Sequence, residues 1–497
     1  MTARGGAGLA PGRPSVNILK YLYKNMSLVL PKKRYLTAAR LQKLYATGRL
    51  SPVEALAQAG RQIVYKNPFV NAFSHVDMAG ALQAARAAEK RWRQGRPLSP
   101  LDGVPVTVKD WYDIKGLPTR MGSVVTDARP KQHNAPVVEA LLKAGAVIIG
   151  KTTLPEMGHK GVTDSRLHGI TRNPHDLTRT CGGSSGGAAV AAAAGFAPLN
   201  LGSDAGGSIR IPASFCGVFG FKPSPGLVPA YPPSLFSTLS SAGPLTLTAA
   251  DAALMMDVIA APCPRDWHAL PDAKEGFDKD GFERGGFEKA LRRALPRLSI
   301  GWWDEAAGHR MEKDVEKVLK QALEKIRPLG VIERVRLDTH DMIDVFNAHW
   351  MAAASYYAGL WPAPLRGKMD PRFLHWAERG AAQSRNDYLK AELARMEIGS
   401  RFKMALEQYD VILSPTTAMT AFAAGQNMPR FASGQNKGKF WDDWTPFTYA
   451  ANLARLPAAS LPAGFTGEGL PVGLQVMSGY LKDKFLLRVC HAIEKVL

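Results

Sequence analysis

Short apolar segments alternate with helical segments along this chain, and this alternation restricts its fold more than any other feature. Residues 103–110 alternate like a strand, residues 137–144 are helical in pattern and residues 146–149 form an apolar strand pattern, followed by a helix at 188–195 and a strand at 198–202. Strands that alternate with helices usually pack into a sheet with helices on its faces. We therefore predict an α/β fold with a large mixed, mostly parallel central sheet covered by helices on both faces.

A region of different character interrupts this alternation. It starts with charged, Gly-rich sequence between about residues 265 and 287, which predicts a surface loop, and continues as strongly helical sequence. Residues 409–415 then return to a buried strand pattern, so the helical region lies within the sheet domain. We predict a basic N-terminal extension at 1–35 and one domain at 36–497, with a core at about 70–262 and 409–497 and a variable helical insert at about 265–408.

Composition restricts the classes of binding partner and the cellular compartment that we expect for this protein. The net charge is +20, but the basic residues are spread along the chain and match no nucleic-acid-binding motif, so no nucleic-acid partner is expected. No apolar run is long enough to span a bilayer, although the basic N-terminus leaves weak peripheral membrane contact open. The four cysteines form no C-x-x-C pair, which favours the cytoplasm. The sequence also leaves open whether the protein forms a homodimer.

Two motifs in the chain match known patterns without their structural context. Residues 145–152 fit the phosphate-loop pattern G-x-x-x-x-G-K-[ST], but the residues between the glycines look like a buried strand rather than a loop. Residues 182–186 fit the G-x-S-x-G nucleophile elbow, but the sequence before Ser184 is polar and not an apolar strand. We expect neither nucleotide binding at the first motif nor an elbow nucleophile at the second.

A second cluster of small residues is better suited to catalysis. Ala205, Gly206 and Gly207 follow a short strand and precede a helix start, so their backbone N–H groups can converge on one point. Such a nest of N–H groups stabilises the oxyanion of an acyl-transfer reaction. Ser208 lies at the edge of the nest and is our candidate nucleophile.

A serine nucleophile needs a base, and Lys109 is the candidate. This lysine ends an apolar strand, at the sheet edge where open α/β sheets place their ligands. Burial disfavours the ammonium form and so favours a neutral lysine that can accept a proton. Ser-Lys pairs are a known alternative to Ser-His-Asp.

These motifs together resemble the amidase signature family. The resemblance covers about residues 36–497 and is weakest between 265 and 440. It is carried by residues 103–110, 182–187, 202–212, 219–226, 456–464 and 469–475. It implies the amidase signature fold, with the helical insert forming part of the substrate pocket.

The resemblance also implies a Ser-Ser-Lys triad of Ser208, Ser184 and Lys109. Ser208 would attack the carbonyl, and Ser184, after a cis peptide bond from Gly183, would pass protons between Ser208, Lys109 and the leaving amine. Ser185 would help to hold Lys109. The oxyanion hole would be formed by Ala205, Gly206, Gly207 and Ser208, and the loop would be braced by Asp204 and Arg210. No cofactor is implied, and His159, His168 and His175 lack the spacing of metal ligands.

Aromatic residues in and after the insert favour a small-molecule substrate with a hydrophobic or aryl group. They are Phe346, His349, Trp350, Tyr356, Tyr357, Trp361, Trp441, Trp444 and Phe447. Each of them could equally be a packing residue of the helical insert.

The expected activity is hydrolysis of a linear amide to a carboxylic acid and ammonia or an amine, with esters or carbamates open to the same acyl-enzyme chemistry. The alternative is the catalytic subunit of a glutamyl-tRNA(Gln) amidotransferase, which would need a partner chain and tRNA. A catalytically silent scaffold is disfavoured because Lys109, Ser184 and Ser208 are all present.

Overall fold

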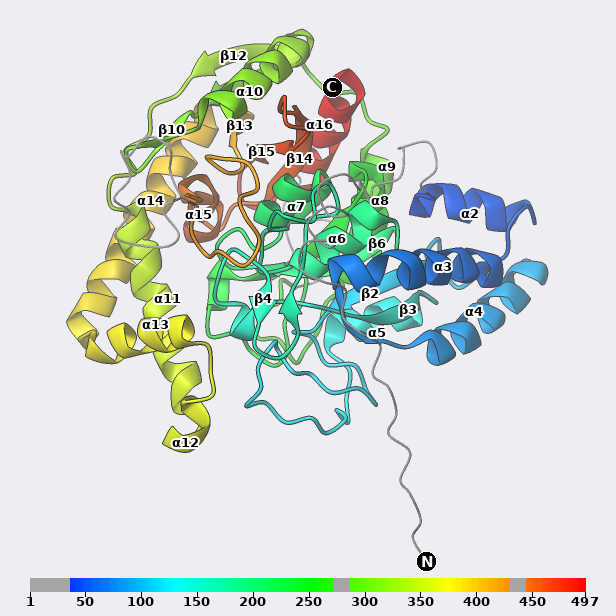
Figure 1. Cartoon of the computed structure of the whole chain (residues 1–497). Helices are drawn as coiled ribbons and strands as arrows, with labels where there is room; N and C mark the ends of the chain where they lie inside the picture. Colours follow the sequence, from blue (N-terminus) through cyan, green and yellow to red (C-terminus); the bar gives the residue numbers. More distant parts are fainter. Residues whose placement is uncertain (1–35, 272–285, 430–443) are drawn as a thin grey trace, which may run out of the picture.

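The structure is a computed structural model that describes residues 36–271, 286–429 and 444–497 (Figure 1). The basic N-terminal extension, most of the Gly-rich loop before Phe287, and Trp441 lie outside the described residues. Among the helices that are described, none is long and apolar enough to cross a membrane.

A mixed sheet of 11 strands forms the centre of the described chain. In spatial order the strands are β1 (Phe73–Val76), β3 (Val147–Thr152), β2 (Pro105–Lys109), β6 (Leu199–Asp204), β8 (Ser241–Thr246), β7 (Phe219–Lys222), β14 (Ala458–Phe465), β15 (Pro471–Met477), β13 (Val411–Pro415), β9 (Leu298–Trp302) and β12 (Gly330–Arg334). Two small two-stranded sheets accompany it, β4 (Asp164–Ser165) with β5 (Gly169–Ile170) and β10 (Glu305–Ala306) with β11 (His309–Arg310). The predicted α/β class and mixed sheet are confirmed.

The expected excess of parallel strand pairs is wrong. In the large sheet, β3 with β2, β2 with β6, β13 with β9 and β9 with β12 are parallel, and the other six neighbouring pairs of described strands are antiparallel. Parallel neighbours need a long crossover connection, usually a helix, whereas antiparallel neighbours can be joined by a turn. The turn at Gly469, whose φ is +79°, joins β14 directly to β15 in this way.

Helices cover both faces of the sheet, as predicted. On one face, a shared apolar core is formed with α2 (Ala38–Ala46), α5 (Pro136–Lys143), α8 (Ala249–Ile259), α10 (Lys313–Ile326) and α16 (Asp483–Val496). On the other face, a second core is formed with α3 (Pro52–Val70), α4 (Met78–Arg93), α6 (Gly186–Ala194) and α7 (Arg210–Cys216). Val106 and Val108 of β2 belong to the first core, so the alternation of a strand turns Lys109 to the second face, toward α6.

Helix α6 packs unusually closely against its surroundings. All nine of its residues are buried, and none is larger than valine. A Cβ atom placed on Gly187 would lie 2.5 Å from the backbone nitrogen of Thr153, so the helix lies directly on neighbouring backbone. The position of Ser184 and Ser185, which immediately precede the helix, is fixed by this packing.

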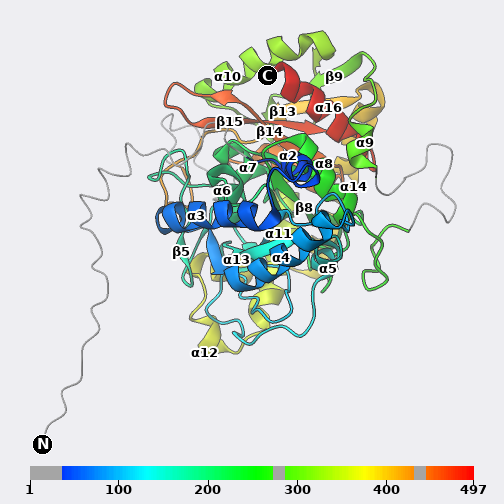
Figure 2. The same cartoon turned by 90° about the vertical axis from the view of Figure 1, so that its right-hand side faces the viewer.

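The segment expected as a helical insert is only partly helical. Its strands β9 and β12 extend the edge of the large sheet, with α10 between them in the chain. Figure 2 shows α10 and α16 at one end of the molecule and α4 and α12 (Ala363–Arg366) toward the other. The remaining helical elements are α9 (Phe287–Ala290), α11 (Met342–Gly359), α13 (Pro371–Ala382), α14 (Arg385–Gln408), α15 (Pro446–Leu453), and the 3₁₀ turns η2 (Glu156–Gly158), η3 (Ser237–Leu239) and η5 (Arg327–Leu329).

The helical part of the insert reaches the loop that follows β6. Helix α11 packs against α13 and α14, and the three lie together on one side of the sheet (Figure 1). Their apolar core includes Ile412 of β13 and Ala205 of the predicted oxyanion loop. The insert is therefore positioned to form a wall of the candidate site.

Candidate active site

Lys109 occupies the end of β2 and is fully buried. Its Nζ donates hydrogen bonds to the hydroxyls of Ser184, Ser185 and Ser203, at 2.7, 2.9 and 2.9 Å. Burial lowers the pKa of Lys109 to about 7, although the negative charge of Asp204 opposes this shift. A lysine with this pKa is substantially neutral at neutral pH, and a neutral amine can accept a proton.

Ser184 and Ser185 approach Lys109 from the turn before α6. The peptide bond between Gly183 and Ser184 is cis, as the family resemblance implies. A Cβ atom on Gly183 would lie 2.7 Å from the backbone of Val162, so this turn has room only for glycine. Both serines are buried, at 2% and 0% exposure, and can act only on groups that enter the site.

The segment before Ser184 does not form the strand that a nucleophile elbow requires. Between β5 and α6 the described chain makes only isolated bridges, Arg172 with Thr180 and Arg179 with Ala423. An elbow serine stands on a sharp turn directly after a strand. The structure therefore agrees with the interpretation that the G-x-S-x-G match at Ser184 is not an elbow.

Ser208 lies in the loop between β6 and α7, with 8% of its surface exposed. Its carbonyl oxygen accepts a hydrogen bond from the backbone N–H of Ser185 at 3.0 Å, which ties the two serine loops together. Within the described residues, no hydrogen bond joins the hydroxyls of Ser208 and Ser184. Catalytic hydrogen bonds often shorten only when the substrate is bound.

Asp204 and Arg210 brace the loop that carries Ser208, and both are fully buried. The guanidinium of Arg210 donates to both carboxylate oxygens of Asp204, each at 2.9 Å. Burial by itself would raise the pKa of Asp204, but the charge and hydrogen bonds of Arg210 hold that pKa well below its usual range. Further hydrogen bonds from Arg210 to Asn452 and Gln475, both at 2.6 Å, connect the loop to α15 and β15.

One member of the predicted oxyanion hole has another partner. The backbone N–H of Gly207 donates to Asp204 Oδ1 at 2.8 Å, and the residue adopts a φ of +120° that favours glycine. Gly207 thus holds the loop in shape. The oxyanion hole formed by Ala205, Gly206, Gly207 and Ser208 stays a prediction.

Ser203 is a contact of Lys109 that was not predicted from the sequence. It lies near the end of β6, the parallel neighbour of β2, and Val108 is in register with Leu201. Polar residues at the same ends of parallel neighbours come together at one sheet edge. The presence of Lys109 and Ser203 near the ends of two strands was the signal that could have revealed this contact.

The phosphate-loop match is a strand, as expected from its sequence. Residues 147–152 form β3, and Lys151 is fully buried. The Lys151 ammonium forms an ion pair with Asp110 at 2.6 Å and donates to the hydroxyl of Thr119 at 2.8 Å. This lysine is a structural cation and is not available to a nucleotide.

Most of the aromatic residues singled out in the sequence are packing residues. Phe346 and Trp350 of α11 are 4% and 6% exposed, and Trp444 stacks on Phe215 of α7 with ring centroids 5.4 Å apart. Phe346 stacks on Tyr449 of α15 at 4.1 Å. The buried rings therefore set the shape of the wall beside the oxyanion loop.

The cysteines and histidines near the site do not add a second chemistry. Burial raises the pKa of Cys181 to about 12 and that of Cys216 well above its usual value, so both stay protonated thiols. Burial also lowers the pKa of His159 to about 4. Over the described part of the chain, no group of three or more side chains is arranged to hold a metal ion.

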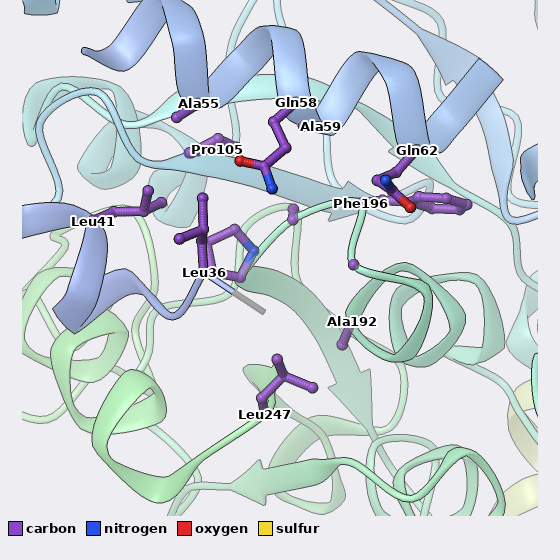
Figure 3. Close-up of a pocket in the computed structure, with 13 residues that line it drawn as sticks. Leu36, Leu41, Ala55, Gln58, Ala59, Gln62, Pro105, Ala192, Phe196 and Leu247 are labelled. Atoms are coloured by element: carbon purple, nitrogen blue, oxygen red, sulfur yellow. The ribbon is translucent and has the colours of Figure 1, made fainter. Parts of the chain in front are cut away.

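A separate apolar pocket lies away from these residues. It is enclosed by α2, α3 and the end of α6, with Leu36, Leu41 and Phe196 among its lining residues (Figure 3). Pro105 also lines it, at the opposite end of β2 from Lys109. The length of β2 therefore separates the pocket from the serine cluster around Lys109.

Comparison with known proteins shows similarity to one family over most of the chain. The sequence profile described as Amidase matches residues 54–487. An acylamidase from Rhodococcus erythropolis is 33% identical, with 93% of this chain and 95% of the relative covered. The A subunit of the glutamyl-tRNA(Gln) amidotransferase from Chloroflexus aurantiacus is also 33% identical, with 93% and 96% covered. The crystal structure of a bacterial aryl acylamidase of the amidase signature enzymes superimposes with a TM-score of 0.84 at 26% identity, covering 93% of this chain and 96% of that one.

Proposed function

Because the chain belongs to the Amidase family, we propose that it hydrolyses hydrophobic or aryl linear amides through an acyl-enzyme on Ser208. The observation that carries this proposal is the buried Lys109 Nζ, held 2.7 Å from the hydroxyl oxygen of Ser184 and with a pKa lowered to about 7. This arrangement supplies a base that is buried, neutral in about half of the molecules at pH 7, and connected to the loop of the nucleophile. The products are a carboxylic acid and ammonia or an amine.

The first half of the reaction forms the acyl-enzyme. Ser208 Oγ attacks the carbonyl carbon while its proton moves to Ser184 Oγ, and the proton of Ser184 moves to Lys109 Nζ. The N–H groups of the 205–208 loop stabilise the negative oxygen that forms. The C–N bond then breaks as the nitrogen takes a proton from Ser184, which is reprotonated by Lys109.

The second half of the reaction releases the acid. Water attacks the Ser208 ester and gives its proton to the same relay of Ser184 and Lys109. The bond between Ser208 Oγ and the acyl carbon breaks, and the proton returns to Ser208. The same steps would cleave an ester or a carbamate, because they depend only on an acyl group and a leaving group that can accept a proton.

The proposal is tested by trapping the nucleophile with a fluorophosphonate. We expect the wild-type chain to be labelled and the Ser208→Ala variant to lose the label. Ser299→Ala, on the distant strand β9, is the matched control and should label like the wild type. Labelling that persists in Ser208→Ala would show that another residue is the nucleophile.

A second candidate function is supported by the equal similarity to the amidotransferase relative from Chloroflexus aurantiacus. In that case the site would release ammonia from glutamine for a partner chain. Glutamine hydrolysis that appears only when the other amidotransferase chains and tRNA are added would favour this function. Hydrolysis of aryl amides by the chain alone would favour the first.

A further inference from the structure

One face of α11 runs along the loops of the active site. A Cβ atom on Gly206 of the oxyanion loop would lie 2.4 Å from the ring of Phe346, so the two are in direct contact. One turn later, Trp350 donates its indole N–H to the carbonyl of His159 at 3.1 Å. Residues four apart share a helix face, and this face continues to Tyr357. The helix therefore borders the site from the oxyanion loop to the segment beside Ser184.

At the far end of this face, the ring of Tyr357 contacts the ring of Trp111. The two rings are arranged edge to face, with centroids 6.2 Å apart and planes at 80°. Trp111 follows Lys109 by two residues. Both rings are half-buried, whereas Phe346 and Trp350 are almost fully covered by packing. Trp111 and Tyr357 thus keep accessible ring surface for another molecule.

Gly158 lies beside both Trp111 and the bridging serine, Ser184. Its φ is +63°, in the left-handed region that favours glycine. A Cβ atom at this position would lie 3.3 Å from Ser184 Oγ and 3.8 Å from the Trp111 ring. The Ser184 hydroxyl and the Trp111 ring therefore lie close to each other beside Gly158.

We propose that the region bordered by Ser184, Gly158 and Trp111 receives the substituent on the amide nitrogen, and that Trp111, supported by Tyr357, selects a flat aromatic one. The inference rests on the proposed function, in which Ser184 returns a proton to the leaving nitrogen. The nitrogen must then lie beside Ser184 Oγ, and its substituent must extend past Gly158 toward Trp111. An aromatic ring there can pack on the indole in an offset or edge-to-face arrangement. The substrate class is the N-aryl amide, and Trp111 is a specificity-determining residue.

The surroundings favour an uncharged substituent. Burial lowers the pKa of Lys109 to about 7, and the buried ammonium of Lys160 is paired with the carboxylate of Asp370. Met157, beside Gly158, belongs to the apolar core of the insert. A neutral aromatic amine is therefore the leaving group that this side of the site accommodates.

The test compares acetanilide with acetamide, which share an acyl group and differ only in the ring on nitrogen. Trp111→Ala should lower kcat/KM for acetanilide on the order of tenfold or more while changing that for acetamide less than about twofold. Trp111→Phe, which keeps a ring, should retain most of the acetanilide activity. Trp267→Ala, which removes a tryptophan that is 81% exposed, is the control and should leave both substrates unchanged. Equal losses on the two substrates, or no loss on acetanilide, would overturn the proposal.

Tyr357 gives a second, independent variant. Tyr357→Ala should reduce acetanilide hydrolysis in the same selective way, Tyr357→Phe should not, and Tyr356→Ala, its exposed neighbour on α11, is the control. Fluorophosphonate labelling of Ser208 is measured on every variant and separates the two proposals. Labelled wild type that cleaves acetamide but not acetanilide would overturn only the aromatic subsite. A wild type that neither labels nor cleaves either amide would overturn the proposed function itself.

Discussion

Two fully buried lysines on neighbouring parallel strands have different surroundings and different tasks. Lys151 on β3 is paired in register with Val108, the residue before Lys109 on β2. The ammonium of Lys151 contacts the carboxylate of Asp110 at 2.6 Å. The hydrogen bonds of Lys109 Nζ within the described residues go instead to the hydroxyl groups of Ser184, Ser185 and Ser203.

The contrast shows that burial alone does not make a lysine a base. Burial lowers the pKa of both lysines, but at Lys151 the charge and hydrogen bond of Asp110 oppose the shift. A touching carboxylate favours the ammonium form, while hydroxyl groups can serve either form. We therefore assign the proton relay to Lys109 and a structural ion pair to Lys151, and four measurements test this assignment.

Lys109→Met should have the strongest consequence. The variant lacks the base, so kcat should fall by roughly a thousandfold or more. Its stability should be unchanged or higher, because a desolvated amine is replaced by an apolar side chain of similar length. Amide hydrolysis and thermal unfolding of the same preparation check both halves. A folded Lys109→Met variant with near wild-type kcat would remove Lys109 from the mechanism.

Lys151→Met should act on stability instead. It leaves the Asp110 carboxylate buried without its cation, which costs about 3–5 kcal/mol of unfolding free energy. Urea unfolding at pH 7 measures this loss. The double variant Lys151→Met/Asp110→Asn should recover part of it, because the unpaired charge is gone. If Lys151→Met unfolds like the wild type, the ion pair is not structural.

The pH dependence should follow Lys109. Because the base must be unprotonated and its pKa is about 7, kcat/KM should fall about tenfold for each pH unit below that value and level off above it. Activity rises with pH because the neutral form of Lys109 is the active base, and burial lowers the pKa of this lysine so that the neutral form is populated near pH 7. A profile of kcat/KM from pH 5 to 9 on a neutral amide checks this. A flat profile between pH 5 and 8 would mean that no group with this pKa controls the reaction.

Ser203→Ala should cause a milder change than the other variants. It removes one of three hydroxyl contacts of Lys109, a change worth about 1 kcal/mol, or several-fold in kcat. The midpoint of the pH profile should also move, since a partner of the amine has been lost. A structural role alone would leave that midpoint in place.

The sequence predicts those parts of the candidate site that depend on local pattern. The end of an apolar strand located Lys109, and the run of small residues at 205–207 located the loop of Ser208. The role of Gly207 could not be derived this way, because it depends on where the Asp204 side chain turns. The Trp111 contact was equally hidden, since its partner Tyr357 lies 246 positions away on the insert.

In the fold, too, some features follow from local sequence pattern and others depend on residues far apart in the chain. Helices on both faces follow from the alternation of strands and helices, but the order of strands is decided by long-range pairing that no local pattern records. Strands β9 and β12 were missed because they lie within a charged region, and β12 has the sequence GVIER with only its first residue buried. Their place in the sheet comes from register with β13 and with each other.

The close packing of α6 restricts which substitutions this protein can accept during evolution. Its buried glycines and alanines leave no space for a larger side chain, so substitutions there would disturb the turn that holds Ser184 and Ser185. The half-buried ring of Tyr357 on α11 can be exchanged with less disturbance to the core. Substitutions that change which molecules fit the candidate site can therefore accumulate at such positions of the insert, while the turn of Ser184 and Ser185 stays under strict constraint.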